Sequence, residues 1–224
     1  MIRAITPDWV ETAEAFHDPP EVPLFPDEEL VISNAVLKRR REFATARMCA
    51  RRAMERLGVP PGPIAKGTRG EPLWPSGVVG SLTHCDGYRA AAVASDRTGI
   101  TIGVDAEPNE ALPDGVTDVV ASAAERARLT RLAADRPQVC WDRLLFSAKE
   151  SAYKAWFPLT RRWLDFDDAS VTIEPDEGVF TVELLVDSTV TIGGERLERF
   201  VGRWSAADGL VATAIAVAAV TPHR

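Results

Sequence analysis

The chain has 224 residues, of which 46% are apolar and 26% charged, and its formal net charge is −7. Its longest uncharged apolar run has eleven residues, whereas a membrane-spanning helix needs about 20, and its three scattered cysteines lack the spacing of a disulfide framework or a zinc site. With no signal-peptide pattern at the start, these features exclude membrane, disulfide-stapled and disordered classes and favour a soluble cytoplasmic protein of one large domain or two lobes.

The first half begins with a proline-rich segment and continues into a helical pattern. Five prolines up to Pro26 predict an extended or irregular opening. Residues 27–57 have a helical pattern, and Gly58 follows as a C-terminal stop. Because this segment is long for one globular helix, and Ser33 with Asn34 offers a second N-cap, we predict two helices.

Positive charge is concentrated in residues 38–56, although the whole chain is acidic. This segment has eight basic side chains and two glutamates, a net charge of +6, which leaves −13 for the rest. Arg39, Arg47 and, less closely, Arg51 lie on related helical faces. Clustered arginines suit phosphate recognition, and Lys66 in the following loop could add to such a site. The alternative is a solvated helix face, which is usually mixed in sign.

Short strands follow the glycine- and proline-rich loop. Segments 78–82, 88–95 and 100–107 are separated by turn residues, which predicts an antiparallel meander. Alternation in the third strand places Asp105 and Glu107 on one face, together with Thr101 and Gly103. Two carboxylates at i and i+2 can approach one Mg²⁺ ion, although an acidic strand end exposed to solvent is the commoner alternative.

The first of these strands ends in Thr83, His84 and Cys85. A lone histidine is more often structural than catalytic. A cysteine beside a histidine could suggest a thiol nucleophile, but nothing in the sequence specifies a pair in which the imidazole activates the thiol. Both interpretations therefore stay open for this strand end.

The second half repeats the order of helices followed by strands. Ser122 and Glu125 form a capping-box signature for a helix that ends near residue 134. A second helix is predicted from about residue 138 to Phe157, with Pro158 as its stop. Four strands are expected after it, at 169–174, 179–186, 196–205 and 210–219. This order of elements predicts an α+β fold.

The second of these helices has charged residues among aromatic ones. Glu150 and Lys154 are four residues apart and share a face, and Lys149 lies about 100° around the helix from Glu150. Bulky apolar side chains surround them, namely Phe146, Tyr153, Trp156 and Phe157. This arrangement is typical of a pocket wall, and the alternative is an ordinary surface ion pair.

Three sequence blocks occur in a specific order: KGTRGEPLWPSGVVGSLTHC at 66–85, GVDAEP at 103–108 and FSAKESAYKAWFP at 146–158. In this order and spacing they closely resemble the phosphopantetheinyl transferases, specifically the two-lobed surfactin-synthetase type in its actinobacterial, enterobactin-synthase-like branch. The resemblance implies two similar α/β lobes, residues 1–107 and 108–224, each with helices packed on a small antiparallel sheet. The active site would lie in the cleft between these lobes.

The resemblance also implies a reaction. Such enzymes transfer the 4′-phosphopantetheine arm of coenzyme A to a serine of an acyl, peptidyl or aryl carrier protein and release adenosine 3′,5′-bisphosphate. These carriers serve polyketide, nonribosomal peptide and siderophore biosynthesis. We expect a cytoplasmic monomer that binds neither nucleic acid nor membrane. The alternative is a coenzyme A or carrier-protein binding module that has lost catalysis.

The family's functional positions can be matched to this sequence. Asp105, Glu107 and Glu150 would hold Mg²⁺, with Mn²⁺ as an alternative. Glu150 would also act as the base toward the carrier serine, Lys154 would neutralise or protonate the leaving phosphate, and His84 would contact phosphate oxygens. The residues matched to coenzyme A binding are Arg39, Arg47, Lys66, Thr83, His84, Lys149 and Lys154. Glu71 stands where some relatives have lysine, so the nucleotide contacts of loop 66–71 stay open.

A surface for the carrier protein is suggested by composition. Carrier proteins in this class of reaction are commonly acidic, so an apolar patch with a few arginines would suit them. The helix at about 123–134 combines these features in Arg126, Arg128, Leu129, Arg131 and Leu132. An amphipathic surface helix without a partner is the equal alternative.

Overall fold

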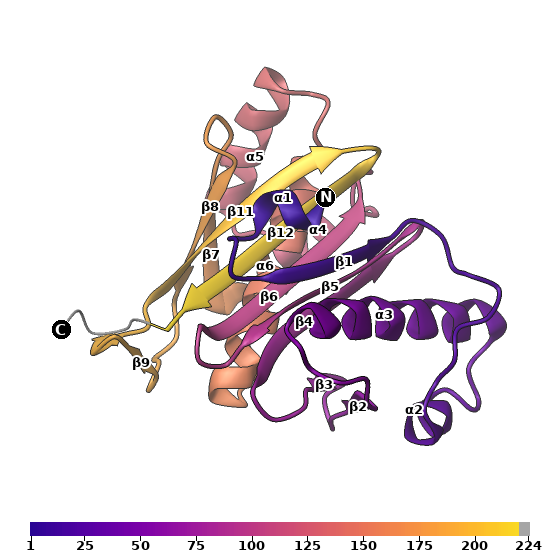
Figure 1. Cartoon of the computed structure of the whole chain (residues 1–224). Helices are drawn as coiled ribbons and strands as arrows, with labels where there is room; N and C mark the ends of the chain where they lie inside the picture. Colours follow the sequence, from indigo (N-terminus) through magenta and orange to yellow (C-terminus); the bar gives the residue numbers. More distant parts are fainter. Residues whose placement is uncertain (220–224) are drawn as a thin grey trace.

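A computed structural model describes residues 1–219, which form two antiparallel sheets with helices against them (Figure 1). The three-stranded sheet has the order β1 (Glu11–Ala15), β5 (Tyr88–Ser95), β4 (Val78–Cys85). The five-stranded sheet has the order β6 (Gly99–Pro108), β12 (Leu210–Ala218), β11 (Arg199–Ala207), β8 (Val179–Leu184), β7 (Ala169–Glu174). The predicted α+β fold is confirmed.

Each sheet is covered by one long helix. The helix α3 (Leu37–Arg56) packs on the three-stranded sheet through Cys49, Ala50, Ala53 and Met54, and α6 (Trp141–Thr160) packs on the five-stranded sheet. Shorter helices are α1 (Ile2–Ile5), α2 (Pro26–Val31), α4 (Val116–Val120), α5 (Ala123–Asp135) and the 3₁₀ turn η1 (Phe166–Asp168). Two small hairpins are β2 (Ala65–Lys66) with β3 (Pro72–Leu73), and β9 (Thr191–Ile192) with β10 (Glu195–Arg196). Within residues 1–219, no helix is long and apolar enough to cross a bilayer.

Most predicted elements are present, but the opening segment and the end of α6 differ from the prediction. The two helices before Gly58 are α2 and α3, whereas the opening contains α1 and β1 and is not wholly irregular. The helix α6 continues through Pro158 to Thr160, so the predicted stop is wrong. Proline in the last turn removes only the bond that its amide would have donated to the carbonyl of Lys154. The helix ends instead at Arg161, which adopts a left-handed conformation.

The strand β6 joins the sheet of the second half. Its backbone pairs with β12, with Asp105 opposite Thr213, so the predicted meander is wrong in its third strand; only β4 and β5 pair as predicted. Alternation shows which residues share a face but not which strand lies alongside. Apolar residues of β6 and β12 are buried in one cluster that also contains Ile2 and Ile5 of α1. The division of the chain at residue 107 remains a prediction.

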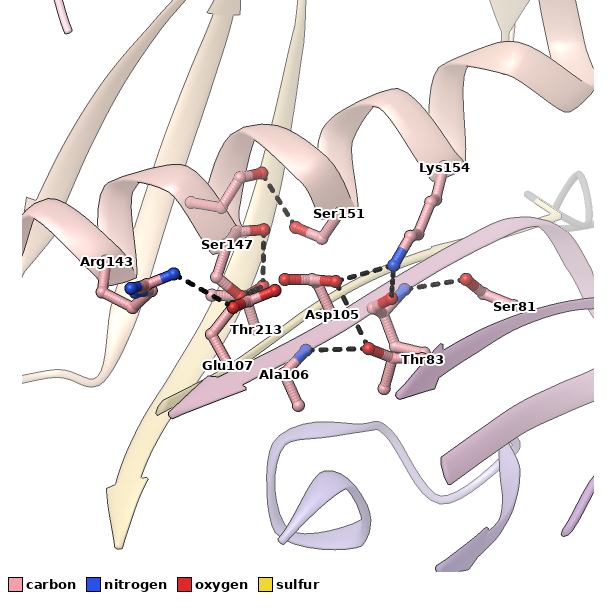
Figure 2. Close-up of polar contacts among 12 residues, drawn as sticks. Ser81, Thr83, Asp105, Ala106, Glu107, Arg143, Ser147, Ser151, Lys154 and Thr213 are labelled. Atoms are coloured by element: carbon pink, nitrogen blue, oxygen red, sulfur yellow. Dashed lines mark hydrogen bonds and ion pairs between the residues drawn. The ribbon is translucent and has the colours of Figure 1, made fainter. Parts of the chain in front are cut away.

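The other edge of β6 meets β4 through side chains. Ser81 Oγ accepts a hydrogen bond from the amide of Val104 at 3.1 Å, and Thr83 Oγ1 accepts one from the amide of Ala106 at 3.0 Å (Figure 2). Both hydroxyls are buried. One serine and one threonine side chain therefore take the place of a backbone ladder between the sheets and satisfy two amides that would otherwise lack a partner.

The helix α6 lies unusually close to β6 because of Gly103. A Cβ atom at this position would lie 1.9 Å from the carbonyl oxygen of Ser151 and 2.7 Å from the amide nitrogen of Ala155. Next to it, Thr101 Oγ1 donates a hydrogen bond to the carbonyl of Ala155 at 2.8 Å. The polar face of β6 is thus held directly against the helix that carries Glu150 and Lys154.

Candidate functional site

Asp105 and Lys154 meet where α6 crosses β6. Lys154 Nζ donates hydrogen bonds to Asp105 Oδ1 at 2.7 Å and to the carbonyl of Val104 at 3.1 Å (Figure 2). The hydroxyl of Thr83 donates to the same Asp105 oxygen at 3.3 Å. Because Thr83 is 2% exposed and both of its hydrogen bonds go to β6, it orients Asp105 and is not open to a ligand.

Glu107 contacts an arginine that was not predicted. Arg143 Nη1 lies 3.3 Å from Glu107 Oε2 (Figure 2). The guanidinium also donates to the carbonyls of Glu110 and Ala111, each at 3.0 Å. Arg143 precedes Glu150 by seven residues and so lies on the same face of α6. Extending that face by two turns toward the N-terminus would have identified it from the sequence.

A cleft of about 620 Å³ lies between α3, β4, the loop before it and α6. Its volume falls within the range of small-molecule sites. Six of the predicted residues line it, namely Arg39, Arg47, Lys66, His84, Glu150 and Lys154. The structure therefore brings together cations from the first half of the chain and the charged pair of α6.

The basic segment divides between this cleft and the protein interior. Arg47 donates through Nε to the carbonyl of Ile64 at 3.0 Å and stacks over Phe43, and burial lowers its pKa to about 10, so it stays charged at neutral pH. Arg51 instead binds Glu28, a fully buried carboxylate, through two contacts of 2.9 Å. The net charge of the segment thus overstates the number of cations that a ligand could reach.

His84 projects into the cleft beside Arg39. Partial removal of the ring from water, and then the charges of Arg39 and Lys154, lower its pKa to about 4, although the side chain keeps considerable exposure. The ring is therefore neutral at neutral pH, and its Nε2 accepts from the Arg39 guanidinium. His84 can act in the cleft as a hydrogen-bonding group and not as a cation.

Cys85 does not behave as a nucleophile in this setting. Burial, and then the carboxylates of Glu107 and Asp105, raise the pKa of its thiol to about 12. The thiolate is the reactive form, and it is scarce at neutral pH when the pKa is this high. The surroundings of Cys85 therefore do not favour the thiol interpretation of this strand end.

Two family models cover much of the chain. Residues 27–94 match the 4′-phosphopantetheinyl transferase N-terminal domain, and residues 101–195 match the 4′-phosphopantetheinyl transferase superfamily. The chain is 57% identical to 4′-phosphopantetheinyl transferase Svp of Streptomyces mobaraensis, over 98% of this chain and 90% of Svp. The chain belongs to the 4′-phosphopantetheinyl transferase superfamily.

Further relatives of this transferase support the predicted branch. It is 50% identical to PptT of Mycobacterium tuberculosis, over 91% of this chain and 90% of PptT, and 50% identical to Npt of Nocardia iowensis, over 97% and 100%. Enterobactin synthase component D of Escherichia coli (strain K12) is 35% identical over 55% of this chain and 58% of its own length. The resemblance inferred from the three sequence blocks is confirmed, and the chain is an enzyme.

The three acidic residues of the transferase lie in a crowded electrostatic setting. Burial, and then Asp105, raise the pKa of Glu107 to about 7. Burial also raises the pKa of Glu150, with Lys154 opposing this shift and Asp105 adding to it. The charge of Asp105 therefore acts on both glutamates.

These acids have one feature that a metal ion would satisfy. Asp105 Oδ2 is buried and has no hydrogen-bond partner, although the other oxygen of the same carboxylate has two. Among residues 1–219, no three His, Cys, Asp or Glu side chains come together closely enough to form a metal site by themselves. The orphaned oxygen and the hard carboxylate donors nevertheless fit Mg²⁺, which takes few protein ligands and keeps several waters.

Lys149 is not at the cleft, and its predicted contact with the nucleotide does not fit the structure. Its ammonium donates to the carbonyls of Val120 and Phe166 at 2.9 and 2.8 Å and to Glu125 Oε2 at 3.1 Å, and the side chain is almost fully buried. Burial alone would raise the pKa of Glu125, but hydrogen bonds from the amides of Val171 and Ser122 and the charge of Lys149 lower it. Lys149 thus links α6 to α4, α5 and η1 within the second half of the transferase.

Proposed function

We propose that this transferase moves the 4′-phosphopantetheine arm of coenzyme A to a serine of an acyl, peptidyl or aryl carrier protein and releases adenosine 3′,5′-bisphosphate. The observation that carries this proposal is the cleft that joins Arg39, Arg47, Lys66 and His84 to Glu150 and Lys154. Its cations suit the phosphates of coenzyme A, and Asp105 beside Lys154 supplies a carboxylate at the far edge.

A divalent cation completes this proposal. Asp105, Glu107 and Glu150 are the residues that would hold Mg²⁺, or Mn²⁺ in its place. When bound, the ion would neutralise charge on the pyrophosphate of coenzyme A. Arg143, which contacts Glu107, and Thr83, which contacts Asp105, would fix the orientation of two of these carboxylates.

The chain's own residues then account for the transfer step. The serine oxygen attacks the phosphorus that bears the pantetheine arm, and the bond from that phosphorus to the oxygen shared with the 5′-phosphate breaks. Glu150 would receive the serine proton, directly or through water. Lys154 would neutralise or protonate the leaving bisphosphate, while His84, Arg39, Arg47 and Lys66 hold the nucleotide. Such reactions depend chiefly on positioning and on electrostatic stabilisation.

Two other functions have less support. A binding module without catalysis would not require Asp105, Glu107, Glu150 and Lys154 together, and all four are present. A nucleic-acid binder would use the exposed part of the basic segment, but the rest of the chain has a net charge of −13, and Arg51 is paired with a buried carboxylate. A monomer that acts in the cytoplasm, without nucleic acid or membrane, remains part of the proposal.

The function is tested by labelling carrier proteins. The full-length transferase is incubated with Mg²⁺, a fluorescent coenzyme A analogue and a panel of acyl, peptidyl and aryl carriers. We expect the label on the carrier serine, loss of labelling when EDTA removes the metal, and recovery when Mg²⁺ is added back. If folded transferase labels none of the carriers, the proposed function is wrong; if EDTA has no effect, the proposed metal is wrong.

We place the carrier-docking surface at α5. A groove of about 320 Å³ lies between this helix and β7 and is lined by apolar side chains such as Leu129 and Leu132, with Arg131 among its cations. Carriers of this class are commonly acidic, so a positive rim would speed and orient their approach.

Reversing the charge of this rim should weaken carrier binding selectively. With Arg131→Glu we expect the KM for an acidic carrier to rise roughly tenfold, because like charges would then face each other, while the KM for coenzyme A stays unchanged. Steady-state kinetics with both substrates measures this, and Arg199→Glu, at an exposed position of β11, is the matched control. Equal carrier KM values for the two variants would remove α5 from the docking surface.

A further inference from the structure

Glu42 is an acidic residue on the cation-rich wall of the cleft. It lies on α3 between two arginines, with Oε2 3.6 Å from Arg39 Nη1 and Oε1 3.5 Å from Arg89 Nη2. Its side chain is 13% exposed, whereas that of Arg39 is 46% exposed. An uncompensated carboxylate at this position would repel a polyanionic ligand. Glu42 therefore suits the cleft only if neighbouring cations neutralise its charge, and its contact with the more exposed Arg39 suggests that it holds that guanidinium.

Arg89 provides that neutralisation from the interior. Its side chain is 5% exposed, its Nη2 lies 2.7 Å from Asp18 Oδ2, and its Nη1 donates to the carbonyls of Cys85 and Tyr88 in the β4–β5 turn. Arg89 is therefore fixed by a turn and by a carboxylate, and Glu42 is fixed by Arg89. The charges of Asp18, Arg89, Glu42 and Arg39 therefore form an ordered series that ends at the cleft.

The cleft end of this series also includes His84. Arg39 Nη1 contacts the Nε2 of the His84 ring as well as Glu42. Burial is the main cause that lowers the pKa of Arg47 in the same wall, Glu28 opposes it, and the charges of Arg51 and then Arg39 add to it. Without a nearby carboxylate, the guanidiniums of Arg39, Arg47 and Arg89 would repel one another, so Glu42 also reduces the electrostatic cost of placing them together.

We propose that Glu42 is a positioning residue that holds Arg39 in place to bind the 3′-phosphate of coenzyme A. This rests on the proposed function, in which Arg39 is among the residues that hold the nucleotide; its assignment to the 3′-phosphate is part of the inference. A long side chain that is already ordered loses less conformational entropy when its ligand binds. A guanidinium held at a fixed angle can also offer two parallel donors to one phosphate.

The test compares two ligands that differ only in that phosphate. Calorimetry on the full-length protein gives the Kd of Glu42→Gln for coenzyme A and for 3′-dephospho-coenzyme A. We expect the Kd for coenzyme A to rise about tenfold, while the Kd for the dephospho ligand changes less than twofold. Glu55→Gln, an exposed position on the same helix, should change neither value. Arg39→Gln should reduce the same discrimination, and adding Glu42→Gln to it should cause little further loss.

Several outcomes would overturn the inference. Tighter or unchanged binding of coenzyme A by Glu42→Gln would mean that Glu42 only competes with the phosphate for Arg39. Equal weakening of both ligands by Glu42→Gln would indicate general damage to the cleft. Unfolding midpoints of all variants identify such damage directly. If the wild-type protein binds neither ligand, the proposed function is wrong as well. If the wild type binds both ligands but Glu42→Gln does not change the discrimination, only the inference about Glu42 is wrong.

Discussion

Asp105→Asn should lower the rate of phosphopantetheine transfer by at least about 100-fold with little effect on folding. Asparagine has nearly the same shape, but only one of its two terminal atoms can accept hydrogen bonds. If the amide nitrogen takes the place of Oδ1, it faces the ammonium of Lys154 and the 2.7 Å contact becomes repulsive. If it takes the place of Oδ2, the buried oxygen that has no partner is replaced by a group that cannot accept a hydrogen bond or bind a cation. Either orientation removes part of the carboxylate's proposed role.

Initial rates of carrier labelling at saturating coenzyme A and Mg²⁺ measure this effect. The matched control is Asp114→Asn, an exposed aspartate in the connection after β6, which should label at the wild-type rate. Mn²⁺ binding followed by electron paramagnetic resonance gives a second readout that does not depend on turnover. A near-normal rate and unchanged Mn²⁺ affinity would show that Asp105 is not a metal ligand.

Gly103→Ala should lower the free energy of unfolding by at least about 4 kcal/mol, a loss typical of overpacking where the surrounding backbone cannot move to make room. The new Cβ would lie 1.9 Å from the Ser151 carbonyl oxygen and 2.7 Å from the Ala155 amide, and both are backbone atoms of α6. The helix could avoid the clash only by moving away from β6. That movement would also separate Lys154 from Asp105, so any folded fraction should transfer slowly.

Urea unfolding followed by tryptophan fluorescence measures the loss. Gly62→Ala is the matched control, because an added Cβ there meets no atom within 4 Å and the backbone conformation is not left-handed. This control should unfold within about 1 kcal/mol of the wild type, with any gain coming from a less flexible unfolded chain. Equal unfolding free energies for the two variants would mean that α6 does not depend on the close approach at Gly103.

The sequence predicts local structure well where one element determines it. The alternation of β6 correctly places Asp105 and Glu107 on one face, because the side-chain period of a strand depends on no other segment. The capping box at Ser122 forms as expected, since both of its hydrogen bonds lie within four residues. By contrast, the neighbour of β6 depends on β12, about 100 residues away, and no local pattern indicates it.

At the site, too, the sequence identifies many of the residues but not the distant partners of each. Four of the six cleft residues lie in the family blocks, which keep their order and spacing, and the other two, Arg39 and Arg47, lie in the basic segment before them. Lys149 differs because its place next to Glu150 in sequence does not reveal that it faces Glu125 and two carbonyls, about 100° around the helix from Glu150. Likewise, the count of arginines in α3 could not reveal that Glu28 of a separate helix binds Arg51.

The pairing of β6 with β12 has a consequence for synthesis on the ribosome. Asp105 and Glu107 are translated about 100 residues before the strand that pairs with their backbone. During that interval, β6 has an unpaired edge, which is the kind of surface that promotes aggregation of nascent chains. The loop between the two strands must also close before the pair forms, which slows this step. The acidic residues of the transferase are therefore fixed late, and a stalled chain that lacks β12 should have no activity.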